Sequence, residues 1–119
     1  MRYDFIQDYC LAKNGATEDY KEEWDAIRYT VCGKIFALIC NDSQGRAVIS
    51  VKHKPETGED LREQYADIIP GYHLNKKHWS SVLLSGDVPD QVLKQMLDES
   101  YELIFNALSQ KIRKAVSSG

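Results

Sequence analysis

The chain has 119 residues, of which 43% are hydrophobic and 28% are charged, as in a typical soluble globular domain. It contains no apolar run long enough to cross a bilayer, its first residues lack the apolar stretch of a secretory signal, and its three cysteines are too irregular for a disulfide framework. We therefore expect one cytoplasmic domain over residues 1–119, and the net charge of −3 argues against a general binder of polyanions.

The first expected element is a helix over residues 2–13, in which apolar and aromatic side chains recur at the spacing of one helical face. Asn14-Gly15 ends this helix, since glycine readily adopts the left-handed conformation found at helix C-termini. Residues 16–25 are polar and acidic apart from Tyr20 and Trp24, which predicts a connection that contains only a short extended piece.

Three strands are expected next, at residues 26–32, 34–40 and 46–52. The first and the third alternate in polarity, and the second is almost entirely apolar, as in a central strand. Gly33 and the turn-forming residues 41–45 provide short connections. Short connections of this kind predict an antiparallel meander.

The second half of the chain predicts a helix, a fourth strand and a longer helix. Pro55 is suited to the first turn of a helix that ends near residue 65 and is weakened by Gly58. Residues 69–71 predict a turn, and residues 79–84 predict a strand. The longest helix is expected to begin at Pro89, with apolar residues along one side.

The predicted fold class is α+β, with the element order α-β-β-β-α-β-α. Strands grouped together with helices at the ends indicate a two-layer sandwich, in which helices pack on one face of an antiparallel sheet. The other face is then open, and we expect basic side chains such as Arg28 and Lys52 to project from it.

Positive charge is concentrated in two segments of this acidic chain. Residues 31–54 carry a net charge of +3 and residues 73–86 a net charge of +2, and together they contain all three histidines: His53, His73 and His78. Such patches also arise by chance on soluble proteins. A functional interpretation requires the two segments to be neighbours in the fold.

The densest motif is HLNKKHW, residues 73–79, directly after Pro70-Gly71-Tyr72. The pattern Pro-x-x-His-x-Asn-Lys-x-His-Trp resembles the signature of the MmcQ/YjbR-like family of small bacterial proteins. The residues at the defined positions are Pro70, His73, Asn75, Lys76, His78 and Trp79. The resemblance extends along nearly the whole chain, through Tyr9-Cys10, Trp24, Ser50-Val51-Lys52, Pro55-Glu56, Leu61-Arg62, Gly86-Asp87-Val88-Pro89-Asp90 and Ser100-Tyr101.

The resemblance implies a fold similar to the CyaY/frataxin class, described as a double wing. It also implies a DNA-binding role, because the family is commonly labelled DNA-binding on the basis of likeness to winged folds. Within the motif, Trp79 is expected to pack in the core against the long helix, with base stacking as the alternative. Asn75 is suited to cap its turn or to bond a base edge.

Catalytic and metal-binding patterns receive little support. The sequence has no Gly-x-Ser-x-Gly and no glycine-rich phosphate loop. Cys10 and Cys40 are expected in the core, and Cys32 is expected to be exposed. The histidines of the motif lack a carboxylate or thiol nearby that would complete a zinc site. We therefore expect a non-enzymatic protein without a cofactor.

The first functional hypothesis is weak, largely sequence-independent binding of duplex DNA. The contact residues would be Lys52, Lys54, His73, Asn75, Lys76 and Lys77. One alternative is a protein-interaction or ligand-sensing domain whose motif is structural. Another is frataxin-like metal handling by the acidic N-terminal region, which rests on analogy of fold alone.

Overall fold

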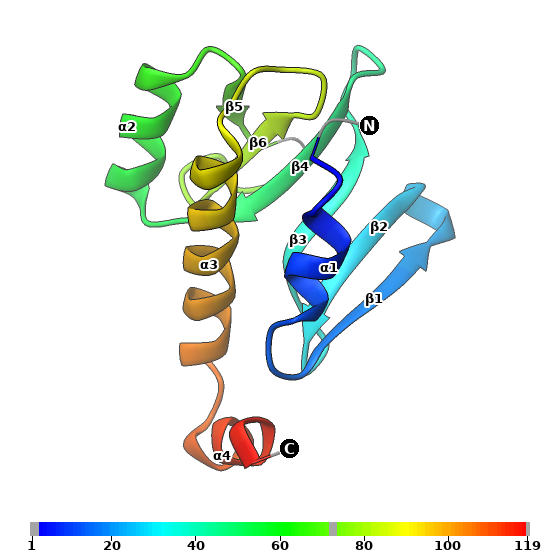
Figure 1. Ribbon diagram of the computed structural model, residues 1–119, viewed down its shortest axis with the longest axis vertical. Coiled ribbons are helices and arrows are strands. Elements are labelled where there is room, and N and C mark those ends of the chain that lie inside the picture. Colours follow the sequence, from blue (N-terminus) through cyan, green and yellow to red (C-terminus); the bar gives the residue numbers. More distant parts are fainter. Residues whose placement is uncertain (1–2, 72–73, 119) are drawn as a thin grey trace.

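The computed structural model describes residues 3–71 and 74–118, and within them six strands form one antiparallel sheet in the order β1-β2-β3-β4-β6-β5 (Figure 1). The strands are β1 (Ala16–Lys21), β2 (Ala26–Val31), β3 (Lys34–Asn41), β4 (Ala47–Lys52), β5 (Ile68–Pro70) and β6 (Trp79–Leu83). The helices are α1 (Ile6–Leu11), the 3-10 helix η1 (Glu22–Trp24), α2 (Pro55–Gln64), α3 (Asp90–Asn106) and α4 (Gln110–Ser118). No helix in the described part of the chain is long and apolar enough to span a membrane.

The α+β class and the central meander are confirmed. β2, β3 and β4 pair as consecutive antiparallel neighbours, and β6 joins the same sheet beside β4. Gly33 has a φ of 78° in the tight connection between β2 and β3, a conformation that costs glycine little. The helix at Pro55 and the long helix after Pro89 also form where the sequence predicts them.

The predicted element order α-β-β-β-α-β-α is wrong, because β1 and β5 are absent from it. β1 has four exposed residues in succession, and its sequence therefore shows no alternation of apolar and polar residues. Its extended conformation comes from backbone hydrogen bonding with β2. β5 is a three-residue strand at the other edge of the sheet. The first helix spans Ile6–Leu11 instead of 2–13, and α4 is a separate helix whose Val116 packs near Gly15.

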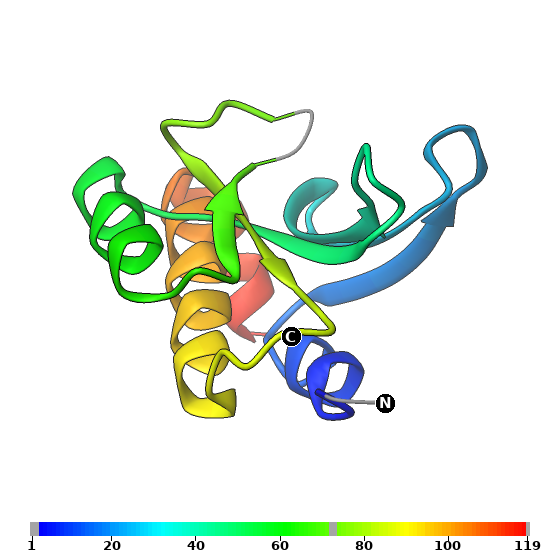
Figure 2. The same ribbon diagram turned by 90° about the horizontal axis from the view of Figure 1, so that it is seen from above.

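Helices α1 and α3 lie on one face of the sheet, as predicted, and the core fills the space between the layers (Figures 1 and 2). Ile6 and Cys10 of α1 and Leu93 and Leu97 of α3 are buried in it. The strand residues of this core are Tyr29, Val31, Phe36, Ala37, Ile49, Val51, Ile68 and Val82. Residues 74–78, which lead into β6, lie on the other face (Figure 2), which we call the open face.

A β-bulge in β3 links the sheet to α3. The pairing of β2 with β3 shifts register between Tyr29 and Thr30, which makes Phe36 the extra residue, and both Phe36 and Ala37 are in the core. The Ser100 hydroxyl of α3 donates to the Phe36 carbonyl at 2.6 Å and accepts from the Lys52 amide at 2.9 Å. A helix side chain therefore bridges β3 and β4 beside the bulge.

The turn between β3 and β4 is organised by the Asp42 carboxylate. It accepts hydrogen bonds from the backbone amides of Gln44 and Arg46, both at 2.9 Å, and from Arg46 Nε at 2.8 Å. Burial alone would raise the pKa of Asp42, but the hydrogen bonds from Arg46 and Gln44 outweigh it and lower that pKa.

A carboxyl with a lowered pKa stabilises the folded state above its unfolded pKa of about 3.9, and this contribution is lost as the pH falls through the folded value. We therefore expect Asp42→Asn to lower the melting temperature at pH 7, with a gap to the parent that closes below about pH 4. Thermal unfolding between pH 2.5 and 7 measures the gap, with Asp60→Asn at an exposed position as the control. A gap of constant size over this range would contradict the assignment.

Candidate nucleic-acid interface

Pairing of β4 with β6 brings the two positive segments together. Lys52 lies opposite Trp79 in the ladder, and the His53 amide donates to the His78 carbonyl at 2.9 Å. Residues 46–54 and the described part of residues 73–79 are therefore neighbours, which was the condition for the functional interpretation of the charge pattern.

The loop before β6 is held by its own polar groups. The Asn75 side-chain oxygen accepts from the Lys77 amide at 2.9 Å, and the Asn75 carbonyl accepts from the amides of His78 and Trp79. Asn75 thus caps its turn, one of the two roles expected for it. Lys76 Nζ donates to the Gly71 carbonyl at 2.9 Å and ties the two sides of the loop together.

Three of the predicted lysines lie on these two paired segments. Lys76 and Lys77 are exposed and Lys52 is half-buried. Within residues 3–71 and 74–118, none of the three forms an ion pair with a carboxylate. His73, also predicted as a contact, lies outside the described residues.

Lys54 belongs to a different surface. It precedes the first residue of α2 and lines a groove along α3 together with the carboxylates of Asp98, Glu99 and Glu102. Its backbone amide donates to Glu99 Oε2 at 3.2 Å. A phosphate at Lys54 would meet these carboxylates, so the structure separates Lys54 from the other predicted contacts.

Trp79 does not pack against α3, and that prediction is wrong. Side chains alternate along β6, and Val82 points into the core, so Trp79 lies on the open face with Ser81 and Leu83. Its cross-strand neighbour Lys52 is on the same face, and the Trp79 ring is half-buried.

The open face is hollowed by a cleft of about 520 Å³. Its apolar lining comes from η1, from the central strands and from the loop before β6: Trp24, Ala26, Leu38, Cys40 and Leu74. Cys40 therefore does not lie in the core as expected, whereas Cys10 does and Cys32 is exposed. Burial raises the pKa of the Cys40 thiol, and the nearby Asp42 carboxylate adds to this effect, so the thiol stays protonated at neutral pH.

A buried polar network joins α2 to the sheet and was not predicted. His53 Nδ1 donates to the Lys54 carbonyl at 2.8 Å, and His53 Nε2 lies 2.7 Å from Ser80 Oγ. Ser80 Oγ also accepts from Arg62 Nη1 at 2.8 Å. The sequence signal for it was Gly58 within a helix, because the imidazole packs directly against this glycine.

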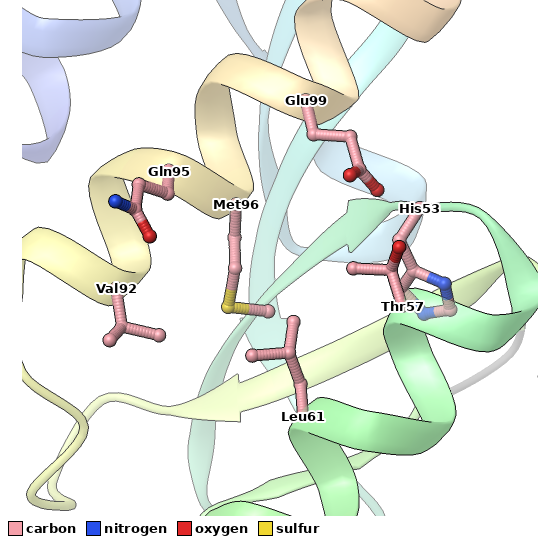
Figure 3. Close-up of a pocket in the computed structure, with 7 residues that line it drawn as sticks. All are labelled: His53, Thr57, Leu61, Val92, Gln95, Met96 and Glu99. Carbon is pink, nitrogen blue, oxygen red and sulfur yellow. The ribbon is translucent and has the colours of Figure 1, made fainter.

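The Ser80–His53 distance matches that of a nucleophile and its base, but the setting is structural. Ser80 is fully buried and does not line the small cavity of about 160 Å³ between α2 and α3, into which His53 faces with Thr57 and Met96 (Figure 3). Among the described residues, no group of three or more His, Cys, Asp or Glu side chains is arranged to hold a metal ion.

Comparison with known proteins gives a consistent result. A family model described as YjbR matches residues 11–103. The chain is 39% identical over 114 residues to the uncharacterized protein YjbR of Escherichia coli K12, and 96% of each chain is covered. The crystal structure of Deinococcus radiodurans DR2400, with a DUF419 domain, has a TM-score of 0.84 and 31% identity over 98% of this chain and 88% of that one. A crystal structure from Pseudomonas syringae has a TM-score of 0.75 and 26% identity over 87% and 99% of the two chains.

Proposed function

The chain belongs to the YjbR family, and we propose that it is a non-enzymatic cytoplasmic protein that binds DNA weakly through Lys52, Lys76 and Lys77. The observation that supports this most is the pairing of β4 with β6, which unites the two positive segments of an acidic chain. Ammonium groups that pair with no carboxylate among the described residues are suited to phosphate, and the exposed Asn75 amide is placed to add a hydrogen bond.

The expected binding is weak and sequence-independent. The interface has few cations, the net charge of −3 opposes a polyanion, and α3 presents carboxylates in the groove beside Lys54. Non-specific complexes of this kind have dissociation constants of about 10⁻⁴–10⁻⁶ M at physiological salt. Contacts to phosphate position a protein on DNA without reading its sequence.

The finer fold assignment belongs to the same proposal. We place the two-layer sandwich in the CyaY/frataxin-like, double-wing class, with the β1–β2 hairpin and the β5–β6 hairpin as its two projecting parts. Helices packed on one face of an antiparallel sheet support this assignment. In it, the open face between the two hairpins is the surface available to DNA (Figure 2).

The double variant Lys76→Ala/Lys77→Ala tests the function. We expect it to bind every duplex sequence roughly tenfold more weakly, and to reduce the slope of log affinity against log salt by about two, since each lost phosphate contact removes about 0.9. Fluorescence anisotropy with a labelled duplex at 50 and 150 mM salt measures both quantities.

The matched control is Lys54→Ala/Lys111→Ala, which removes the same charge from two exposed positions away from the interface and should leave the slope unchanged. Equal effects of the two double variants would show that net charge alone is being measured. No detectable binding by the parent protein at ~50 mM salt, where screening is weak, would favour a protein-interaction or ligand-sensing domain instead.

A further inference from the structure

The largest exposed apolar side chain of the cleft is Trp24. This side chain is 52% exposed, although large aromatic side chains are usually buried. The Tyr20 hydroxyl bonds Asp25 at 2.5 Å and so fixes the tip of the hairpin. The Arg28 guanidinium and the Lys21 ammonium lie 5.7 and 5.9 Å from the indole centroid. The hairpin therefore holds a flat aromatic surface at the rim of the cleft.

The rest of the cleft suits a planar apolar group. Leu74 forms the wall on the side of the β5–β6 loop, and Ala26 and Leu38 lie on the sheet between the two walls. A volume of about 520 Å³ is within the range of ~300–1,000 Å³ usual for ligand pockets. The polar groups at its edges are the Glu23 carboxylate and the Asn41 amide, which match the donors and acceptors of a base edge.

The two walls differ in charge, which determines how a nucleotide would lie. Leu74 is followed in the chain by Asn75 and the exposed Lys76 and Lys77. The opposite wall is acidic even though Glu23 is paired with Lys21 at 3.0 Å, because residues 19–28 carry four carboxylates against Lys21 and Arg28 and so have a net charge of −2. A phosphodiester backbone is attracted to the lysine side and repelled by the carboxylate side, so only the uncharged base would extend across the cleft toward Trp24.

From this geometry we infer that the cleft holds one unpaired base of single-stranded DNA, stacked on Trp24, while the adjacent phosphates contact Lys76 and Lys77. The inference rests on the proposed function and adds the preferred form of the nucleic acid. Bases of an intact duplex are stacked and paired, so they cannot enter the cleft, and the duplex keeps only the phosphate contacts.

The test compares two labelled oligomers of equal length and charge, oligothymidylate of 12 nucleotides and a chain of 12 abasic phosphodiester units. Stacking of one base contributes roughly a 5- to 150-fold gain in affinity. We expect the parent protein to bind oligothymidylate about tenfold more tightly than the abasic chain, and Trp24→Leu to remove this preference while its binding of the abasic chain stays unchanged.

Trp24→Phe is the matched control, because it keeps an aromatic ring at the rim of the cleft, and its preference for oligothymidylate should persist. Lys76→Ala/Lys77→Ala should weaken binding of both oligomers by the same factor. Equal affinity of the parent protein for the two oligomers would overturn the base site and leave the proposed DNA binding intact. Failure to bind either oligomer at ~50 mM salt would overturn the base site, and failure to bind the duplex under the same conditions would overturn the proposed function as well.

Discussion

Replacing Gly58 by alanine should destabilise this protein by about 1–3 kcal/mol, the usual cost of overpacking a rigid site. A methyl carbon at this position would lie 2.0 Å from His53 Cε1 and 2.5 Å from each ring nitrogen. The imidazole cannot easily withdraw, because its two nitrogens contact the Lys54 carbonyl and Ser80 Oγ. In an ordinary helix interior the same substitution stabilises by roughly 0.5–1 kcal/mol, so the sign of the effect identifies the contact.

Urea denaturation of Gly58→Ala measures this cost, and the His53→Ala background provides the control. Once the imidazole is removed, the added methyl group has space, so Gly58→Ala should become neutral or stabilising in that background. The two substitutions should therefore show a coupling free energy of about 1–3 kcal/mol, as expected for residues in direct contact. A more stable Gly58→Ala in the parent background would show that the ring is not fixed against α2.

The meander and the two main helices were predictable because their signals are local. Residues 26–32 alternate, residues 34–40 are continuously apolar, and Gly33 and residues 41–45 mark turns. β1 was not predictable in this way, because its residues are exposed and its extended conformation depends on pairing with β2. Alternation of apolar and polar residues arises where one face of a strand is buried. An edge strand with little buried surface therefore shows no such alternation.

In the candidate site, the two positive segments meet the condition that the sequence analysis set for a shared surface, because β4 pairs with β6, but the sequence did not place every side chain in them. The strand at 79–84 has apolar residues at odd-numbered and at even-numbered positions, and these point to opposite faces of the sheet. Its sequence therefore does not specify which face Trp79 occupies. Register with β4 decides this, since Val82 lies opposite the core residue Ile49. Lys54 follows Lys52 closely in the chain, yet it lies against α3, because the chain turns into α2 between the two surfaces.

The Gly58–His53 contact and the Trp24 cleft were not predictable for a related reason. Each joins residues from elements whose relative placement is set by tertiary packing. Gly58 alone indicates only a weakened helix, and Trp24 in an acidic segment indicates only a connection. The role of each residue depends on a partner from another element. Gly58 packs against the His53 ring, and Trp24 lines the cleft together with Leu74.

Ser100→Ala should destabilise the protein by about 2–4 kcal/mol, because a buried carbonyl and a partly buried amide lose their partner and each such loss costs about 1–3 kcal/mol. The Ser100 hydroxyl accepts from the Lys52 amide and donates to the Phe36 carbonyl where the bulge in β3 disturbs the sheet. Ser100 is fully buried, so water cannot take over these hydrogen bonds without opening the contact between α3 and the sheet.

Chemical denaturation measures this loss against Ser117→Ala, which makes the same chemical change at an exposed helical position and should alter stability by no more than about 0.5 kcal/mol. Amide hydrogen exchange gives a local readout of this bond. In Ser100→Ala, the Lys52 amide should lose its protection against exchange, whereas the amides of Ile49 and Val51 in the same strand should stay protected. Since Lys52 also belongs to the proposed DNA interface, this bond couples the position of α3 to the end of β4 that carries the lysine. A Ser100→Ala variant with parental stability and a protected Lys52 amide would show that the β3–β4 ladder is closed without the serine.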